Sequence, residues 1–221
     1  MFNSIDTAFY HPIQECMYLF KGEGFIKYKS GQGVELITVE SIGIIGVDGW
    51  LGLPKAFCSD IDTAFIYHNE YLYFFKGEEF VRWDVANDTL SPGYPKNINA
   101  IWSGLATHFT EDGQLRYYED SDSITAFFKS GKHLQHMRGD TGLWDVCSWT
   151  SGVWKGSVIN SEALPKNFLQ HLDAVVHLPC GETYFFAGHD YLVWNTADGL
   201  LTGYPKPITA EQRSALCIAE V

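Results

Sequence analysis

The sequence has few charged residues and lacks the patterns that mark membrane and zinc proteins. Charged residues make up 19% of the 221 residues, against about 25% in an average soluble protein. No apolar run approaches the roughly 18 residues that a membrane-spanning helix needs, so we expect no membrane span. The five cysteines are widely spaced and include no Cys-x-x-Cys pair, which argues against a zinc ribbon or a thioredoxin-like site.

Sequence motifs of the common catalytic sites are missing as well. The chain contains no nucleophile elbow, no P-loop, no His-Glu-x-x-His and no Gly-x-Gly-x-x-Gly at the start of a helix. Each of these motifs uses its spacing to position a nucleophile, a metal or a phosphate. We therefore predict that the protein is not an enzyme.

Positive charge is scarce, and the formal net charge is −12. So acidic a surface repels phosphate backbones and anionic lipids, which excludes nucleic acid and acidic membranes as main partners. Residues Met1 to Tyr10 show neither a basic start nor an apolar run, so no secretory signal is visible. The odd cysteine count leaves at least one thiol without an intrachain partner, which favours a reducing compartment. We expect a cytoplasmic protein, or a secreted one if a signal was removed.

Aromatic residues and glycine are abundant. Phe, Tyr and Trp together reach 15% of the chain, and there are 21 glycines. Aromatic residues favour strands and glycine favours turns, so this composition predicts an all-β protein. The length fits one or two domains.

A short aromatic segment that ends in glycine recurs about every 55 residues. A periodicity of this size indicates a repeat architecture. Its four copies, of which the third is the weakest, are Tyr18–Gly22, Tyr73–Gly77, Ala126–Gly131 and Tyr184–Gly188.

An aspartate lies 11 or 12 residues before three of these segments, within Ile5–Phe9, Ile61–Phe65 and Leu172–Val176. In the third repeat, counting back 10 or 11 residues from Ala126 leads to Arg116 in place of the aspartate.

Each repeat reads as three strands joined by tight hairpins, followed by a longer connection with room for a short outer strand. Such a unit has two apolar faces and is not stable alone. Four units arranged radially bury these faces, so we predict one domain, a four-bladed β-propeller. A solenoid is the alternative, but its ends require caps. The predicted blades are residues 1–57, 58–111, 112–168 and 169–221.

The combined pattern of Ile61–Phe65, Tyr73–Asp84 and Gly93–Ile98 resembles the hemopexin repeat. The resemblance implies a stand-alone four-bladed propeller of the hemopexin-like family. It also implies an axial channel in which main-chain carbonyls of the first strands hold calcium or sodium, hard cations that prefer oxygen ligands. The predicted metal ring is formed by the carbonyls of Asp6, Asp62, Arg116 and Asp173. The predicted second channel level is Ala8, Ala64, Tyr118 and Val175.

The leading hypothesis for function is a non-enzymatic ligand-binding protein with a small ligand near the channel mouth. The resemblance to plant seed albumins of the family implies haem or a polyamine, and the net charge also favours a cationic ligand. One alternative is an adhesive or lectin-like module that binds proteins or glycans, with a homodimer formed through blade edges. A further alternative is a storage or defence protein.

Three other features leave alternatives open. The eight histidines allow a transition-metal site, although His133 and His136 should point to opposite faces of a strand. The residues Trp144, Trp149 and Trp154 either fill an irregular outer blade or form an aromatic binding surface. The family resemblance also implies a disulfide between the last and first blades, but no cysteine precedes Cys16.

Overall fold

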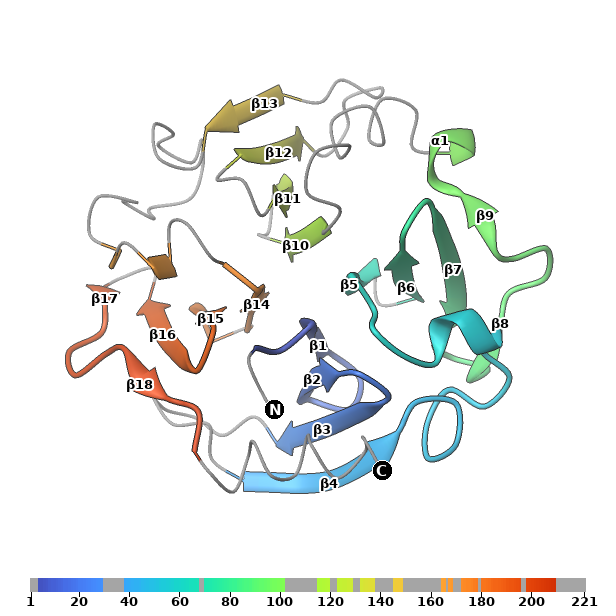
Figure 1. Cartoon of the computed structure of the whole chain (residues 1–221), viewed down its shortest axis with the longest axis horizontal. Helices are drawn as coiled ribbons and strands as arrows, with labels where there is room; N and C mark the ends of the chain where they lie inside the picture. Colours follow the sequence, from blue (N-terminus) through green and yellow to red (C-terminus); the bar gives the residue numbers. More distant parts are fainter. Residues whose placement is uncertain are drawn as a thin grey trace.

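Four antiparallel sheets surround a central axis in the computed structural model of the chain (Figure 1). Each sheet is one blade, with its first strand innermost. The predicted all-β, four-bladed architecture is therefore confirmed. The described residues are 4–29, 38–67, 70–101, 115–119, 123–128, 132–137, 145–148, 164–165, 167–168, 172–178, 180–195 and 198–209.

Blades 1 and 2 follow the same antiparallel order, each strand pairing with the next. In blade 2 an additional short strand, β9, pairs with β7. The strands of blade 1 are β1 (Thr7–His11), β2 (Cys16–Lys21), β3 (Gly24–Lys29) and β4 (Thr38–Ile44), and the 3-10 helix η1 (Lys55–Phe57) follows them. The elements of blade 2 are β5 (Thr63–Tyr67), β6 (Tyr71–Lys76), β7 (Glu79–Asp84), β8 (Thr89–Leu90), β9 (Lys96–Asn97) and α1 (Ile98–Ile101).

Blades 3 and 4 repeat this order, and in blade 4 the strand β18 pairs with β16. The strands of blade 3 are β10 (Leu115–Glu119), β11 (Ser123–Phe128), β12 (Lys132–Met137) and β13 (Asp145–Ser148). The strands of blade 4 are β14 (Ala174–His177), β15 (Glu182–Ala187), β16 (Asp190–Asn195), β17 (Gly199–Leu200) and β18 (Lys206–Pro207). The blade boundaries assigned from the sequence stay predictions.

The innermost strands form a closed ring. Strand β1 contacts β5 on one side and β14 on the other, and β10 contacts the same two strands across the ring. A closed ring needs no capping repeat, which is the physical difference from a solenoid. None of the described helices is long and apolar enough to cross a membrane.

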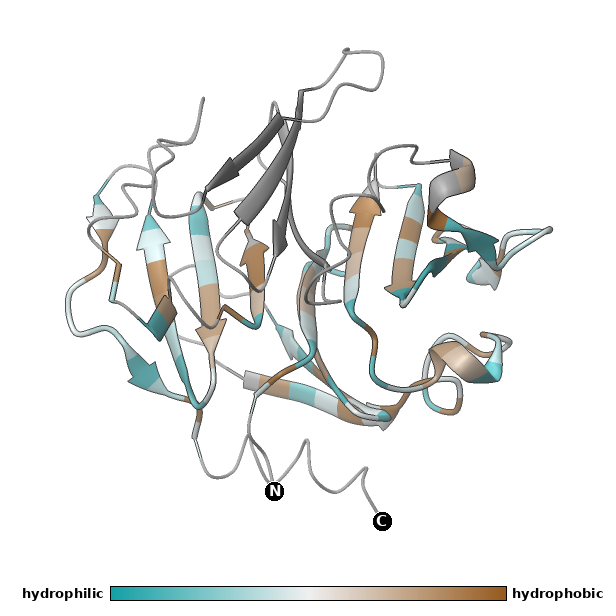
Figure 2. Ribbon diagram, turned by 45° about the horizontal axis from the view of Figure 1, so that its top comes forward, coloured by the Kyte–Doolittle hydropathy of each residue, from teal (hydrophilic) through white to brown (hydrophobic). Residues whose placement is uncertain are grey.

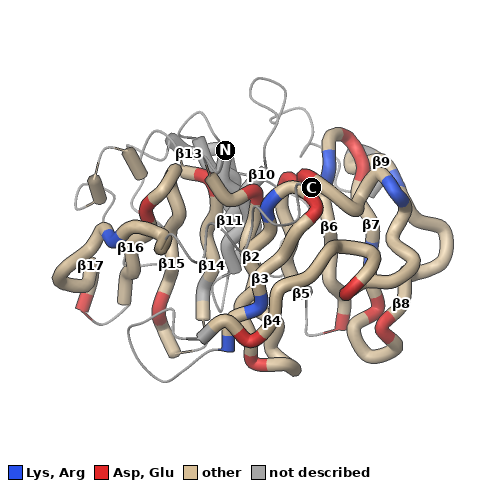
Figure 3. The backbone as a smooth tube through the Cα atoms, turned by 60° about the horizontal axis from the view of Figure 1, so that its bottom comes forward, with Lys and Arg blue, Asp and Glu red and all other residues tan. Residues whose placement is uncertain are grey.

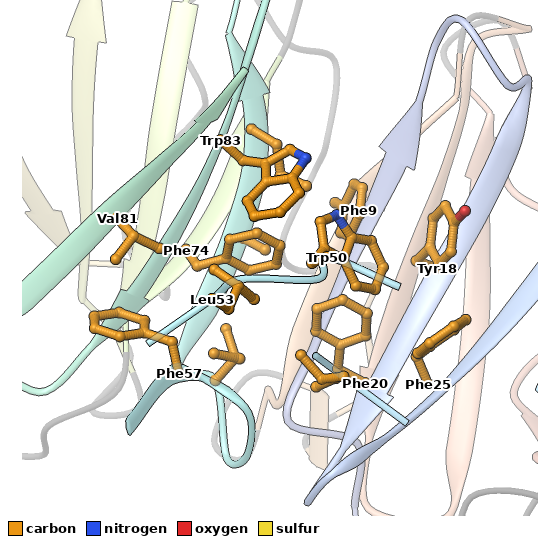
Figure 4. Packing of buried hydrophobic residues seen from close by; sticks show 14 of the residues in the cluster. Phe9, Tyr18, Phe20, Phe25, Trp50, Leu53, Phe57, Phe74, Val81 and Trp83 are labelled. Carbon is orange, nitrogen blue, oxygen red and sulfur yellow. The ribbon is translucent and has the colours of Figure 1, made fainter. Parts of the chain in front are cut away.

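Aromatic residues fill the space between blades 1 and 2 (Figure 4). The rings of Phe20 and Phe74 are stacked with centroids 6.0 Å apart, and Trp50 meets both edge-on at 5.2 and 5.6 Å. Burial of one such ring stabilises a fold by roughly 1.5–3 kcal/mol. In Figure 2 the apolar residues follow the strands inside the blades, whereas polar residues gather on turns and at the rim. The excess of aromatic residues is therefore the packing material between blades.

Tight turns join the second and third strands of blades 1, 2 and 4, as the sequence predicts. The strand pairings leave two turn residues in each case. Gly22, Gly77 and Gly188 begin these turns with φ of 56°, 58° and 61°. A positive φ at the first central position is what a type II′ hairpin turn requires.

Candidate functional site

The candidate site is the ring of inner strands, where three aspartates occupy equivalent positions. Thr7 pairs with Phe20, Thr63 with Phe75 and Ala174 with Phe186. The aspartate directly precedes the first residue of each of these pairs, and its amide donates to the paired phenylalanine carbonyl at 2.8–2.9 Å. The structure thus brings Asp6, Asp62 and Asp173 to one level of the ring.

The side chains of these aspartates bind the neighbouring hairpin turns. The amide of Gly22 donates to Asp6 at 2.6 Å, that of Gly77 to Asp62 at 2.6 Å, and that of Gly188 to Asp173 at 2.5 Å. We call this contact the Asp–Gly clamp. It ties the start of each inner strand to the turn between the next two strands.

In blade 1 the clamp also includes a lysine. Lys21 Nζ lies 2.9 Å from Asp6 Oδ1, while the amide of Gly22 occupies Oδ2. Both oxygens of this carboxylate are therefore engaged within the blade. The aspartate and the glycine of each clamp are 16, 15 and 15 residues apart, and this regular separation is visible in the sequence. The prediction from the sequence gave the aspartates only a main-chain role and missed the side-chain contact.

One buried hydrogen bond links the inner strands of blades 1 and 2. The amide of Ala64 donates to Thr7 Oγ1 at 3.2 Å, so it points away from β6, the partner of its own strand. In an antiparallel pair the N–H and C=O of one residue lie on the same side of the strand. The carbonyl of Ala64 therefore faces away from β6 as well, on the side of β5 that borders the ring.

Blade 3 places Arg116 at a different level from the three aspartates. Arg116 pairs with Phe127, and the equivalent pairs in the other blades begin with Ala8, Ala64 and Val175. Arg116 therefore belongs to the second level, which the prediction assigned to Tyr118. Tyr118 pairs with Thr125 and lies two residues further along the strand.

This difference from the predicted level comes from the count within the third repeat. Counting back 11 or 12 residues, as in the other repeats, leads to position 114 or 115, whereas the prediction used 10 or 11. The strand register selects Gln114 as the equivalent of the aspartates. Gln114 lies outside the described residues.

The histidines do not gather into a metal site within the described part of the chain. That part contains no group of three or more His, Cys, Asp or Glu residues placed to hold a metal. His11 is buried, its Nδ1 accepts the amide of Gln14 at 3.3 Å, and burial lowers the pKa of its imidazole. His133 and His136 lie on β12, whereas the three tryptophans Trp144, Trp149 and Trp154 lie outside the described residues.

Negative charge is spread over the molecule. In Figure 3 acidic residues lie on turns and strands of every blade that is shown in detail, and basic residues are interspersed among them. The net charge of −12 therefore gives a general attraction for cations. It does not mark one described surface as a charged pocket.

Four radial sheets, a closed ring of inner strands and a repeated Asp–Gly clamp define the class of the protein as a four-bladed β-propeller. It is a hemopexin-fold protein. The family model for Hemopexin matches residues 61–106, a range that includes blade 2 from β5 to α1.

Solved structures show the same fold over nearly the whole chain. The crystal structure of the hemopexin-fold protein CP4 from cowpea has a TM-score of 0.73 at 16% identity, covering 98% of this chain and 96% of that chain. A plant albumin from Cicer arietinum showing hemagglutination has a TM-score of 0.69 at 16% identity, with 92% of each chain covered. A plant lectin with two metal-binding sites, also from Cicer arietinum, has a TM-score of 0.63 at 18% identity, covering 93% and 91%. These identities establish the fold alone.

Proposed function

We propose that this protein is a non-enzymatic binding protein that holds a cation on its axis. The observation that carries the proposal is the common register of the inner strands around a closed ring. The carbonyl of Ala64 lies on the ring side of its strand, because its amide reaches across to Thr7. Ala8 and Val175 have the same register, so we expect their carbonyls to have the same orientation. These residues belong to the predicted second channel level, and the metal ring at the carbonyls of Asp6, Asp62 and Asp173 stays a prediction.

Calcium or sodium suits such a ring, because hard cations bind neutral oxygen ligands as well as carboxylates. The clamp supports main-chain coordination: both oxygens of Asp6 are already occupied within blade 1. In blade 1 the carboxylate is thus used by the clamp, and this supports carbonyls as the ligands of the proposed cation. The net charge of −12 adds a long-range attraction for the ion.

A small ligand near the mouth of the ring is the second part of the proposal. The hemopexin resemblance supports haem, and the negative net charge supports a polyamine. Both ligands can be tested with the same protein and the same readout. Spermine tests the contribution of the negative charge, and hemin tests the expectation from the hemopexin resemblance.

Thermal unfolding of chelator-treated protein tests both parts. A ligand at about 100 times its Kd stabilises the native state by roughly 2.7 kcal/mol, which corresponds to about 5–10 °C in Tm for a chain of this size. We expect calcium to raise Tm in this range and to remain bound in native mass spectrometry. Absence of both effects would refute the axial cation. If neither spermine nor hemin shifts Tm at tens of micromolar, the small-ligand part is refuted while the cation stands.

A lectin-like role is the second candidate. It is supported by two proteins of the same fold, the hemagglutinating albumin and the lectin with two metal-binding sites. Agglutination requires at least two binding sites on one particle, so this role predicts a dimer or two glycan sites per chain. A glycan array together with an erythrocyte agglutination assay tests it. A monomer that is silent in both assays would exclude this role.

A further inference from the structure

An arginine on the outer half of blade 2 is held against two tyrosine rings. The guanidinium carbon of Arg82 lies 4.3 Å from the centre of the Tyr71 ring and 5.2 Å from that of the Tyr94 ring. All three side chains are half-buried. Val81 and Trp83, the neighbours of Arg82 on β7, pack toward blade 1, so alternation along the strand puts Arg82 on the other face of the blade. The two rings stabilise a cation that is partly open to solvent (Figure 1).

Ser91 uses only part of the hydrogen-bonding capacity of Arg82. Arg82 Nε donates to Ser91 Oγ at 3.2 Å, and the amide of the buried Ser91 donates to the carbonyl of Arg82 at 2.8 Å. A guanidinium has five N–H donors, and aromatic rings that contact its flat face leave its edge open. Within the described residues Arg82 donates no other hydrogen bond. Its two terminal amino groups are therefore available to a ligand.

A second cation contacts one of the same tyrosines. Lys96 Nζ lies 4.7 Å from the centre of the Tyr94 ring, on strand β9, which pairs with β7. Neither Lys96 nor Arg82 forms an ion pair with any described residue. Asp84, two positions along β7, has both carboxylate oxygens engaged by Asn87 at 2.9 Å. Like charges beside one ring repel each other, and a bound anion would remove that repulsion.

The equivalent positions in blades 1 and 4 lack this pair of cations. The residue opposite the tyrosine of the second strand is Lys27 in blade 1, Arg82 in blade 2 and Val193 in blade 4. Lys27 is neutralised by Glu40 at 3.4 Å. In blade 4, Lys206 also contacts a tyrosine ring, at 4.8 Å, but Val193 supplies no second charge. Among these three blades, only blade 2 has two neighbouring cations without a carboxylate.

We propose that Arg82 and Lys96 bind a small ligand that carries at least two carboxylates, such as a di- or tricarboxylic acid. The paired N–H groups at the edge of a guanidinium match the two oxygens of one carboxylate. The ammonium group of Lys96 attracts the second carboxylate as a point charge. The net charge of −12 repels anions at long range, so recognition depends on these short-range contacts. This proposal is independent of the axial cation and of the lectin-like role.

Titration of the full chain with citrate, followed by NMR of the arginine side chains, tests the site. The sequence contains only four arginines, so the signal that disappears in Arg82→Lys belongs to the Nε–H group of Arg82. We expect citrate to shift this signal in a saturable way at constant ionic strength, with a Kd of about 1 mM or below. Sodium chloride at the same ionic strength should not reproduce the shift.

Two variants separate the contributions of the cations, with the backbone amide of Ser91 as the reporter of Kd. Arg82→Lys keeps the charge but loses the paired donors, so Kd should rise at least about tenfold. Lys96→Gln removes one partly exposed charge and should raise Kd roughly 2–5-fold. Lys206→Gln is the matched control, because Lys206 contacts a tyrosine ring in the same way but has no arginine beside it. It should leave Kd unchanged.

Four results would overturn the proposal. The first is the absence of a saturable shift up to about 10 mM citrate, and the second is an equal shift in sodium chloride. The third is an equal effect of Lys96→Gln and Lys206→Gln, a comparison that stands even if Arg82→Lys folds poorly. The fourth is binding of sulfate as tight as that of citrate, which would show that the site does not select two carboxylates.

Discussion

Replacing Asp173 by alanine tests whether the Asp–Gly clamp stabilises the blade in which it lies. The carboxylate of Asp173 accepts the amide of Gly188 at 2.5 Å, and the residue is only 7% exposed. Alanine removes the acceptor and leaves the glycine amide without it. We expect the free energy of unfolding to fall, without an effect on the proposed binding of a cation by main-chain carbonyls.

The magnitude follows from burial and charge. A hydrogen bond to a charged group contributes about 1.5–3 kcal/mol, and a partly buried amide left without an acceptor costs a similar amount that overlaps with it. We therefore expect Asp173→Ala to cost about 2–4 kcal/mol. Asp6→Ala should cost less, because Asp6 is less buried and its pair with Lys21 is worth at most about 1 kcal/mol. Asp62→Ala should cost least, about 1 kcal/mol, because its contact with Gly77 is exposed.

Guanidinium unfolding, followed by far-UV circular dichroism and tryptophan fluorescence, measures these differences. The two signals must coincide for a two-state analysis to apply. Asp173→Asn is the matched control, because the amide keeps an acceptor oxygen and loses the charge, so it should retain part of the stability. Terbium luminescence on the folded variants reports cation binding separately.

Two results would contradict the reasoning. If Asp173→Ala and Asp62→Ala cost the same, burial does not set the strength of the clamp. If Asp173→Asn folds normally yet loses cation binding, the carboxylate is itself a ligand and the division between side chain and main chain is wrong.

Three further predictions concern single contacts. Thr7→Val removes the acceptor of the Ala64 amide at nearly constant volume and should lower the free energy of unfolding by about 1–3 kcal/mol in denaturant unfolding. Thr7→Ser keeps the hydroxyl and should retain most of this stability. Asp88 accepts the indole of Trp83 at 3.0 Å with a φ of 48°, so Asp88→Ala should cost about 1–2 kcal/mol and Asp88→Gly less, because glycine relieves the backbone strain. Burial lowers the pKa of His11 below 6.5, so the unfolded chain binds the proton first and stability falls as the pH drops below 6.5. The urea midpoint of the unchanged protein should therefore be lower at pH 5.5 than at pH 7.5, and His11→Asn should make this difference smaller.

The repeat made the fold predictable from the sequence. Tyr18–Gly22, Tyr73–Gly77 and Tyr184–Gly188 carry aromatic residues that can be buried on both faces, then a glycine that forces a turn. A strand between two blades needs this pattern, since neither face meets water. Local chemistry and global packing therefore agree, and the architecture follows.

The site was less predictable, for two physical reasons. The clamp joins residues 15 or 16 positions apart across two strands, so an isolated aspartate in the sequence does not reveal its partner. The predicted position of Arg116 depended on counting residues in the third repeat, whose aromatic segment is the weakest. A shift of two residues along a strand keeps a side chain on the same face but moves it to the next level of the ring. Only the pairing of Arg116 with Phe127 fixes that level.

The clamp also bears on which cation the proposed ring would hold. Both oxygens of Asp6 are occupied within its blade, so the ligands proposed for the ring are neutral carbonyls. Affinity for calcium rises with the number of charged ligands, and a ring of carbonyls therefore discriminates weakly between calcium and sodium. Screening by salt weakens the attraction of a surface with a net charge of −12. Calcium should accordingly be displaced by sodium as ionic strength rises, and retention of calcium in molar sodium chloride would show that a carboxylate takes part in binding.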